Sequence, residues 1–215
     1  MPRPEPLYPD RVIILAPEYL SGAEYYATMM AYPQAVIDTS MRFDKRRKQM
    51  HRCEIADTHG RLTLTVPIEK PRSMTSALWS DITVSGHDRW WTKHLEALRS
   101  AYGRTPFFEY YIDSFMPFFS RSAEGMKLMD MNMRLDELVR QILCIDTAVT
   151  CSMENIRFNG HTDDFRSIPI QTPASRPYYQ IWSRKYGFMA NLSILDLIFN
   201  MGPEAPLVLR SMLKP

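Results

Sequence analysis

The chain has 215 residues, a length typical of a single domain. Charged residues make up 23% of it and the formal net charge is +2, which argues against a broad nucleic-acid-binding surface. No apolar run approaches the roughly 18–20 residues of a membrane span, and the proline-bearing N-terminus lacks the apolar core of a secretion signal. The 3 cysteines form no C-x-x-C pair, so we expect reduced thiols in a cytoplasmic protein.

The N-terminal half carries most of the strand signals. Short apolar or alternating runs predict strands over 12–16, 35–38, 50–55, 62–68 and 81–85. The first two runs flank a predicted helix over 23–31, so they form a βαβ unit with a parallel strand pair. The third and fourth flank the turn ADTHG and predict an antiparallel pair. We therefore expect a mixed α/β protein, with a central mixed parallel and antiparallel sheet flanked by helices.

The C-terminal half is predicted to be mainly helical. Periodic apolar residues indicate helices over 88–102, 107–119, 127–143, 192–201 and 205–213, the second of them broken near Pro117. Ser85 and Asp88 have the spacing of a capping box for the first of these helices. A short strand over 147–152 is expected to rejoin the sheet.

The domain prediction is one unit over 1–215. Residues 1–10 are expected to form an extended, proline-rich lead-in. The polar, proline-bearing segment 155–177 is predicted to be a mobile loop or lid.

Parallel sheets bind ligands at the carboxyl ends of their strands. The loop that follows the strand at 12–16 carries Glu18, Tyr19 and, at the start of the next helix, Glu24. These side chains are the first candidates for a ligand site. The loop has no glycine-rich fingerprint, which argues against dinucleotide binding there.

The run 178–204 contains a very apolar helix near the end of the chain. Asn191 is expected to cap this helix, because its side-chain oxygen can accept the N–H groups of the first turn. Ser193, Asp196 and Asn200 fall on one narrow stripe of the helix surface. The stripe either faces water or forms the floor of a pocket, and the sequence leaves both alternatives open.

No strong catalytic or metal motif is present in the sequence. The chain lacks a P-loop, H-E-x-x-H and G-x-S-x-G, and its 5 histidines do not group at metal-ligand spacing, so no metal is assigned and the cofactor is unknown. His94 is the best candidate for a general base, with a structural role as the alternative. His51 and Cys53 share a strand face, either as packed neighbours or as a histidine-activated thiol.

Two further stretches have a structural and a functional interpretation. The basic run 42–52, which includes Lys48 and Arg52, is either a solvated loop or a grip on phosphate or carboxylate groups. The aromatic stretch 107–119 is either a wall of the core or a stacking platform for a ligand.

Several segments together resemble the WbqC-like proteins of bacteria, in the shorter form found in Bacteroidetes. The matching segments are PEYLSGAEYYATMMAY (17–32), KQMHRCEI (48–55), LTLTVPI (62–68), WTKHLEALRSAYGRTPFFEYY (91–111) and YGFMANLSILDLIFNMGPE (186–204). They occur in the expected order, and the last is the most specific. The chain departs from the family pattern at His51, where members usually carry Asn, and at Ser21, where they often carry Pro.

The resemblance implies a transferase of surface-polysaccharide (O-antigen) synthesis, which passes glycine or a similar acyl group to an amino sugar. The implied partners are small molecules, namely a nucleotide-linked amino sugar and an activated amino acid or other acyl donor, with no nucleic acid. Whether ATP is used stays open. The alternative is a non-catalytic protein that binds a ligand or partner through the aromatic stretch 107–119.

The resemblance also implies a set of site residues. The catalytic residues would be His94, which removes a proton from the sugar amine, and Asp196. The residues that would bind substrate are Tyr19, Glu24, Tyr25, Lys48, Arg52, Lys93, Asn191, Ser193, Asn200 and Glu204. These groups are expected to meet in one cavity between the loop after the first strand, the basic strand and the C-terminal helix.

Overall fold

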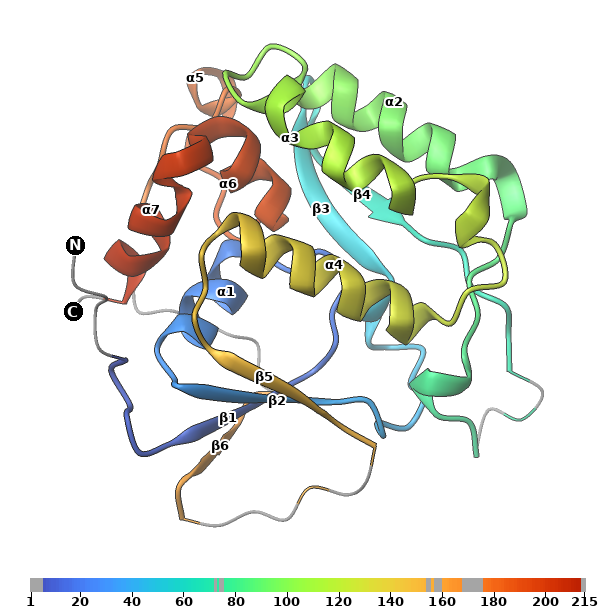
Figure 1. Ribbon diagram of the computed structural model, residues 1–215. Helices are drawn as coiled ribbons and strands as arrows, with labels where there is room; N and C mark the ends of the chain where they lie inside the picture. Colours follow the sequence, from blue (N-terminus) through green and yellow to red (C-terminus); the bar gives the residue numbers. More distant parts are fainter. Residues whose placement is uncertain are drawn as a thin grey trace.

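The computed structural model describes residues 6–71, 73, 76–153, 156, 160–167 and 176–213 (Figure 1). Its strands are β1 (Val12–Leu15), β2 (Gln34–Asp38), β3 (Arg52–Asp57), β4 (Gly60–Thr65), β5 (Ala148–Ser152) and β6 (Thr162–Asp164). Its α-helices are α1 (Ala23–Met30), α2 (Trp90–Tyr102), α3 (Phe108–Phe115), α4 (Leu128–Ile142), α5 (Ser183–Tyr186), α6 (Ile194–Met201) and α7 (Ala205–Met212).

Four strands form a parallel sheet in the order β5-β2-β1-β6. β1 lies inside it, paired along both edges, and its residues Ile13, Ile14 and Leu15 are fully buried. This is usual for a parallel strand, because other parts of the chain cover both faces of the sheet. The predicted βαβ unit is confirmed, since α1 connects the parallel pair β1 and β2. The strand expected to rejoin the sheet is also confirmed, as β5 pairs with β2.

The edge strand β6 lies inside the segment predicted to be a loop. Its sequence, Thr-Asp-Asp, has no apolar signal, but Thr162 to Asp164 pair in parallel with Val12 to Ile14. Arg11, just before β1, forms an ion pair with Asp163 of β6. This side-chain contact holds β6 against β1. Most of the other residues between 155 and 177 lie outside the described residues, as do residues 1–5 of the expected lead-in.

The other two strands form the predicted antiparallel hairpin. Cys53 pairs with Leu64 and Ile55 with Leu62, which places the apolar side chains of β3 and β4 on one face toward the core. The α/β class is therefore confirmed, with its parallel and antiparallel strands in two separate sheets. α4 lies between these sheets (Figure 1).

The strand predicted over 81–85 does not form. Its residues make single bridges to two different neighbours, Ile68 with Val84 on one side and Thr83 with Lys127 on the other. The backbone groups of this segment are therefore shared between residues 67–69 and 125–128, without a continuous ladder to either.

Both predicted helix caps are wrong. α2 begins at Trp90 without a side-chain cap, because Asp88 and Arg89 adopt the left-handed conformation, with φ of 64° and 43°. α6 is capped by Ser193, whose Oγ accepts from Leu195 N at 3.4 Å. Asn191 lies before this cap in a left-handed turn, with φ of 53°.

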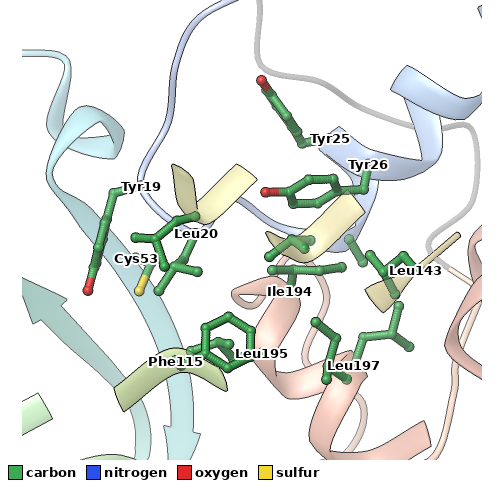
Figure 2. Close-up of a cluster of buried hydrophobic side chains, with 14 of the residues drawn as sticks. Tyr19, Leu20, Tyr25, Tyr26, Cys53, Phe115, Leu143, Ile194, Leu195 and Leu197 are labelled. Carbon is green, nitrogen blue, oxygen red and sulfur yellow. The ribbon is translucent and has the colours of Figure 1, made fainter. Parts of the chain in front are cut away.

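The core is filled by aromatic and aliphatic side chains from all parts of the chain. Figure 2 shows one part of it, where Leu195 of α6 lies beside Phe115 of α3 and Tyr26 of α1 lies near Ile194. The aromatic stretch over 107–119 is mainly core wall, with Phe108, Phe115 and Phe119 buried, and α3 ends before a 3-10 turn that contains Pro117.

Asn132 of α4 connects the two sheets. Its side chain is 1% exposed, and Nδ2 donates to the carbonyls of Pro17 and Met50, both at 2.8 Å. Pro17 follows β1 and Met50 precedes β3. One amide group thus fixes the end of the central parallel strand relative to the start of the hairpin.

Replacement of Asn132 by Leu should lower the free energy of unfolding by about 2–4 kcal/mol, because the two carbonyls lose a buried donor. Urea unfolding at pH 7 measures this. The matched control is Gln141→Leu on the exposed side of the same helix, which should change the free energy by less than about 0.5 kcal/mol. Equal stability of the two variants would contradict this role of Asn132.

Candidate functional site

The carboxyl end of β1 opens into a pocket of about 490 Å³, which we name the loop pocket. It lies between the loop 18–22, the start of β3 and residues 191–193. The residues that line it are Glu18, Tyr19, Leu20, Ser21, Gly22, Lys48, Gln49, Arg52, Cys53, Glu54, Thr63, Asn191 and Ser193. The loop after the first strand and the basic strand therefore do share a cavity with the start of the C-terminal helix.

Backbone contacts hold the loop in place. Tyr19 N donates to Gln49 O at 2.9 Å, and Ile194 N donates to Ser21 O at 2.8 Å. Ser193 joins two walls of the pocket, because its N–H donates to Glu54 O at 2.7 Å and its Oγ donates to Leu20 O at 2.9 Å. These bonds keep Leu20 at a φ of 45°, a conformation that costs energy for a residue other than glycine.

Gly22 allows Asn191 to approach the loop closely. A Cβ atom at Gly22 would lie 2.1 Å from Asn191 Oδ1, which is far inside van der Waals contact. The Asn191 backbone N–H donates to Glu24 Oε1 at 3.1 Å. Glu24 is buried beneath this turn and does not line the pocket, so the structure assigns it to holding the wall.

The basic wall of the pocket carries an unsatisfied donor. Arg52 Nε is buried and has no hydrogen-bond partner among the residues that the structure describes. Lys48 stands exposed at the rim, and within the same described ranges neither cation forms an ion pair. Because a buried donor without an acceptor costs free energy, this wall is suited to a ligand that supplies anionic oxygens.

Glu18 is the half-buried acid of the loop pocket. Burial raises the pKa of its carboxyl group, and a hydrogen bond from Ser21 Oγ partly opposes the rise. The position after a buried parallel strand already pointed to this residue, yet the site residues implied by the family resemblance do not include it. A carboxylate with a raised pKa in a ligand pocket is a candidate proton acceptor.

Tyr19 and His94 form a buried pair behind the pocket. Figure 2 shows the Tyr19 ring beside Cys53, and its hydroxyl lies 3.2 Å from His94 Nδ1. His94 Nε2 lies 3.2 Å from Thr65 O, and since a carbonyl can only accept, Nε2 carries the proton and Nδ1 accepts from Tyr19. Burial lowers the pKa of His94 to about 4. Both ring nitrogens have protein partners, so the geometry favours positioning of Tyr19 over proton abstraction.

Asp196 and Asn200 lie outside the loop pocket, in a buried polar network. Asp196 Oδ2 accepts from Tyr178 OH at 2.7 Å and from Gln180 Nε2 at 2.9 Å, and Asn200 Oδ1 accepts from Ile181 N at 3.0 Å. Burial raises the pKa of the Asp196 carboxyl group. The predicted stripe therefore faces neither water nor a pocket floor along most of its length, and of its three residues Ser193 alone lines the pocket.

Three other predicted binding residues lie apart from the loop pocket. Tyr25 is buried and donates to Ala16 O at 3.0 Å. Lys93 is exposed on α2, where it forms an ion pair with Asp88. Glu204 is exposed in the 3-10 turn after α6. The expectation of one shared cavity thus holds for Tyr19, Lys48, Arg52, Asn191 and Ser193.

The structure excludes an activated thiol at Cys53. Burial raises the pKa of its thiol to about 12, so the group stays protonated. His51 does not approach it as a base, because His51 Nδ1 pairs with Val66 O at 3.0 Å and burial lowers the pKa of its ring. The two residues are packed neighbours.

A second pocket, of about 320 Å³, lies at β4 and the start of α2, and we name it the edge pocket. The residues that line it are Leu62, Thr63, Leu64, Thr65, Pro67, His87, Asp88, Trp90, Lys93, His94 and Ala97. Thr63 lines both pockets. Lys93 and His94 from the predicted set belong to this second pocket.

The described residues contain neither a metal-binding cluster nor a membrane-spanning helix. Among them, no cluster of three or more His, Cys, Asp or Glu side chains is arranged to hold a metal ion. No helix in these ranges has the length and apolarity needed to cross a bilayer.

The fold and the pocket define an α/β protein with a polar cavity at the carboxyl end of a parallel strand. The WbqC-like protein family matches residues 16–171, and the chain belongs to this family. The chain is also 24% identical over 232 residues to the uncharacterized protein Rv1507c of Mycobacterium tuberculosis, a match that covers 93% of this chain and 97% of that protein. No solved structure matches the chain.

The stability of the protein should depend on pH through His94. Its pKa is about 4 in the folded protein and 6.5 ordinarily, so the unfolded chain binds more protons between these values. The free energy of unfolding should therefore fall as the pH drops through this window, by up to about 1.4 kcal/mol per pH unit. His94→Gln, whose amide can still donate to Thr65 O, should remove this contribution.

Urea unfolding of the parent protein and of His94→Gln at pH 7, 6 and 5 measures how steeply the free energy of unfolding of each changes with pH. His59→Gln replaces an exposed histidine and is the matched control, which should keep the slope of the parent protein. Identical slopes for the parent and His94→Gln would contradict a buried, neutral His94.

Proposed function

We propose that the protein is a cytoplasmic transferase that joins glycine, or a similar acyl group, to an amino sugar carried on a nucleotide diphosphate. The reaction would be a step of surface-polysaccharide synthesis, as the family resemblance implies. The observation that carries the proposal is Arg52, which lines the loop pocket and whose buried Nε lacks an acceptor among the described residues. Diphosphate oxygens are acceptors that a guanidinium group binds in pairs.

The other groups of the loop pocket suit a sugar nucleotide. Lys48 adds a second cation at the rim. Ser21, Asn191 and Glu54 offer a hydroxyl, an amide and a carboxylate to sugar hydroxyl groups. The cavity, at about 490 Å³, falls in the range of roughly 300–1,000 Å³ that is usual for small-molecule sites.

Glu18 is the proposed proton acceptor. The sugar amine attacks the carbonyl carbon of the activated acyl group, a C–N bond forms, and the bond to the activating group breaks with its electron pair on the leaving group. The proton that the nitrogen loses passes to the Glu18 carboxylate, whose pKa burial has raised. Glu18 takes this part in place of His94, because both ring nitrogens of His94 are already bonded.

A non-catalytic ligand-binding protein is the second candidate. It is favoured by one observation, namely that the expected catalytic residues His94 and Asp196 are both buried and bonded within the protein. Such a protein would use the loop pocket. The aromatic stretch 107–119 offers little surface to a ligand, because its phenylalanines are mostly buried and Tyr110, at 77% exposure, contacts Tyr111.

Binding of UDP- and dTDP-linked amino sugars, measured by isothermal titration calorimetry, tests the acceptor site. Arg52→Gln should weaken binding at least about tenfold, because it removes a charged, bidentate donor. Arg46→Gln is the matched control, since Arg46 lies in the same basic run, exposed and outside the loop pocket, and should bind as the parent does. Absence of binding to the parent, or equal binding by Arg52→Gln, would remove the proposal.

Turnover separates the transferase from the binding protein. Glu18→Gln keeps the hydrogen bond with Ser21 but cannot accept a proton, so kcat should fall by about 100-fold or more with little change in KM for the sugar. Mass spectrometry of the acylated sugar nucleotide measures the rate. Sugar binding with no acyl transfer to any activated glycine would favour the non-catalytic alternative.

A further inference from the structure

The edge pocket lies along the free edge of β4. Val66 N donates to His51 O at 2.9 Å, just beyond the pair Arg52 and Thr65. In an antiparallel ladder, hydrogen-bonded and non-hydrogen-bonded residue pairs alternate. Since Val66 and His51 are a bonded pair, Thr65 and Thr63 belong to non-bonded pairs, and their N–H and C=O groups point away from β3. The contact from His94 Nε2 to Thr65 O agrees with this direction.

Thr63 therefore presents an amide and a carbonyl to the edge pocket. The residue is exposed, and no partner for these two backbone groups occurs in the part of the chain that the structure describes. The walls around them are apolar and come from Leu62, Pro67, Trp90 and Ala97. The free N–H and C=O of a strand edge can bond to secondary amides, and the apolar walls can pack against methylene groups. The pocket is therefore suited to an extended chain in which amides alternate with short methylene links.

We propose that the edge pocket is the donor subsite of the transferase and binds the pantetheine-type arm of an acyl thioester. This inference rests on the proposed function, and it names the class of acyl donor. The pocket of about 320 Å³ suits a slender arm, whereas a peptide would also need room for its side chains. Lys93 at the rim can meet the anionic end of such a donor, because its ion pair with Asp88 is exposed and therefore weak.

Thr63 lines both pockets, so in this proposal the donor and the acceptor lie on either side of this one residue. The acyl carbon at the end of the arm then reaches the amine held in the loop pocket. A C–N bond forms and the C–S bond breaks, with the electron pair on sulfur. The proton lost by the amine passes to Glu18 and then to the thiolate, so the products are the acylated amine and the free thiol.

Calorimetric titration with S-acetylpantetheine tests the subsite without any acceptor present. Thr63→Pro removes an outward N–H that takes no part in the hairpin ladder, and Ala97→Phe fills the pocket. Each should weaken binding at least about tenfold. Thr92→Phe places the same ring on an exposed position of α2 outside the pocket, so this control should bind as the parent does.

Three results would overturn the inference: no binding of S-acetylpantetheine by the parent, unchanged binding by Ala97→Phe, or equally tight binding of the peptide acetyl-Gly-Ala-Gly-amide. If Thr63→Pro fails to fold by circular dichroism, Ala97→Phe decides alone. The sugar-nucleotide titration is independent of this one. Loss of sugar binding with thioester binding intact would refute the acceptor site alone, and the reverse result would refute the donor subsite alone.

Discussion

The buried amide of Asn132 is the contact on which the arrangement of the molecule depends. The parallel sheet and the hairpin share no ladder of hydrogen bonds, so their relative position must be set by what lies between them. α4 fills that space, and the Asn132 side chain bonds the chain on both sides of it. The loop pocket begins next to this contact, because Tyr19 and Gln49, which are joined by a backbone hydrogen bond, both line it.

The polar groups of the C-terminal segment have two different uses. The network around Asp196 ties the stretch that includes Tyr178 and Gln180 onto α6, and it is closed to solvent. Ser193, one turn earlier, bonds to the loop and to β3 and remains at the pocket wall. The buried Asp196 carboxylate therefore does not indicate a catalytic site, because its hydrogen bonds to Tyr178 and Gln180 explain its position in an apolar helix.

Periodicity predicted the α/β class, the βαβ unit, the hairpin and the strand at β5, because each of these buries a regular apolar pattern. It could not predict β6, whose pairing depends on Arg11 and a parallel neighbour. For the site, the strand-end rule found the loop with Glu18 and Tyr19, and charge pointed to Arg52. The partner of His94, Tyr19, lies 75 residues away and has no signal near His94 in the sequence. The partners of Asp196, Tyr178 and Gln180, lie in the same run, but their non-helical segment has no periodicity that would place them on α6.

Asn191 and Ser193 form one wall of the loop pocket but lie outside the part of the chain that matches the family. The match to the family spans residues 16–171, whereas this wall comes from the following segment. A fragment cut at the end of the match would retain the basic strand and the loop but would leave the left-handed turn at Leu20 without its anchor. The cavity is thus a property of the assembled chain, and its shape is acquired only when the last helices dock.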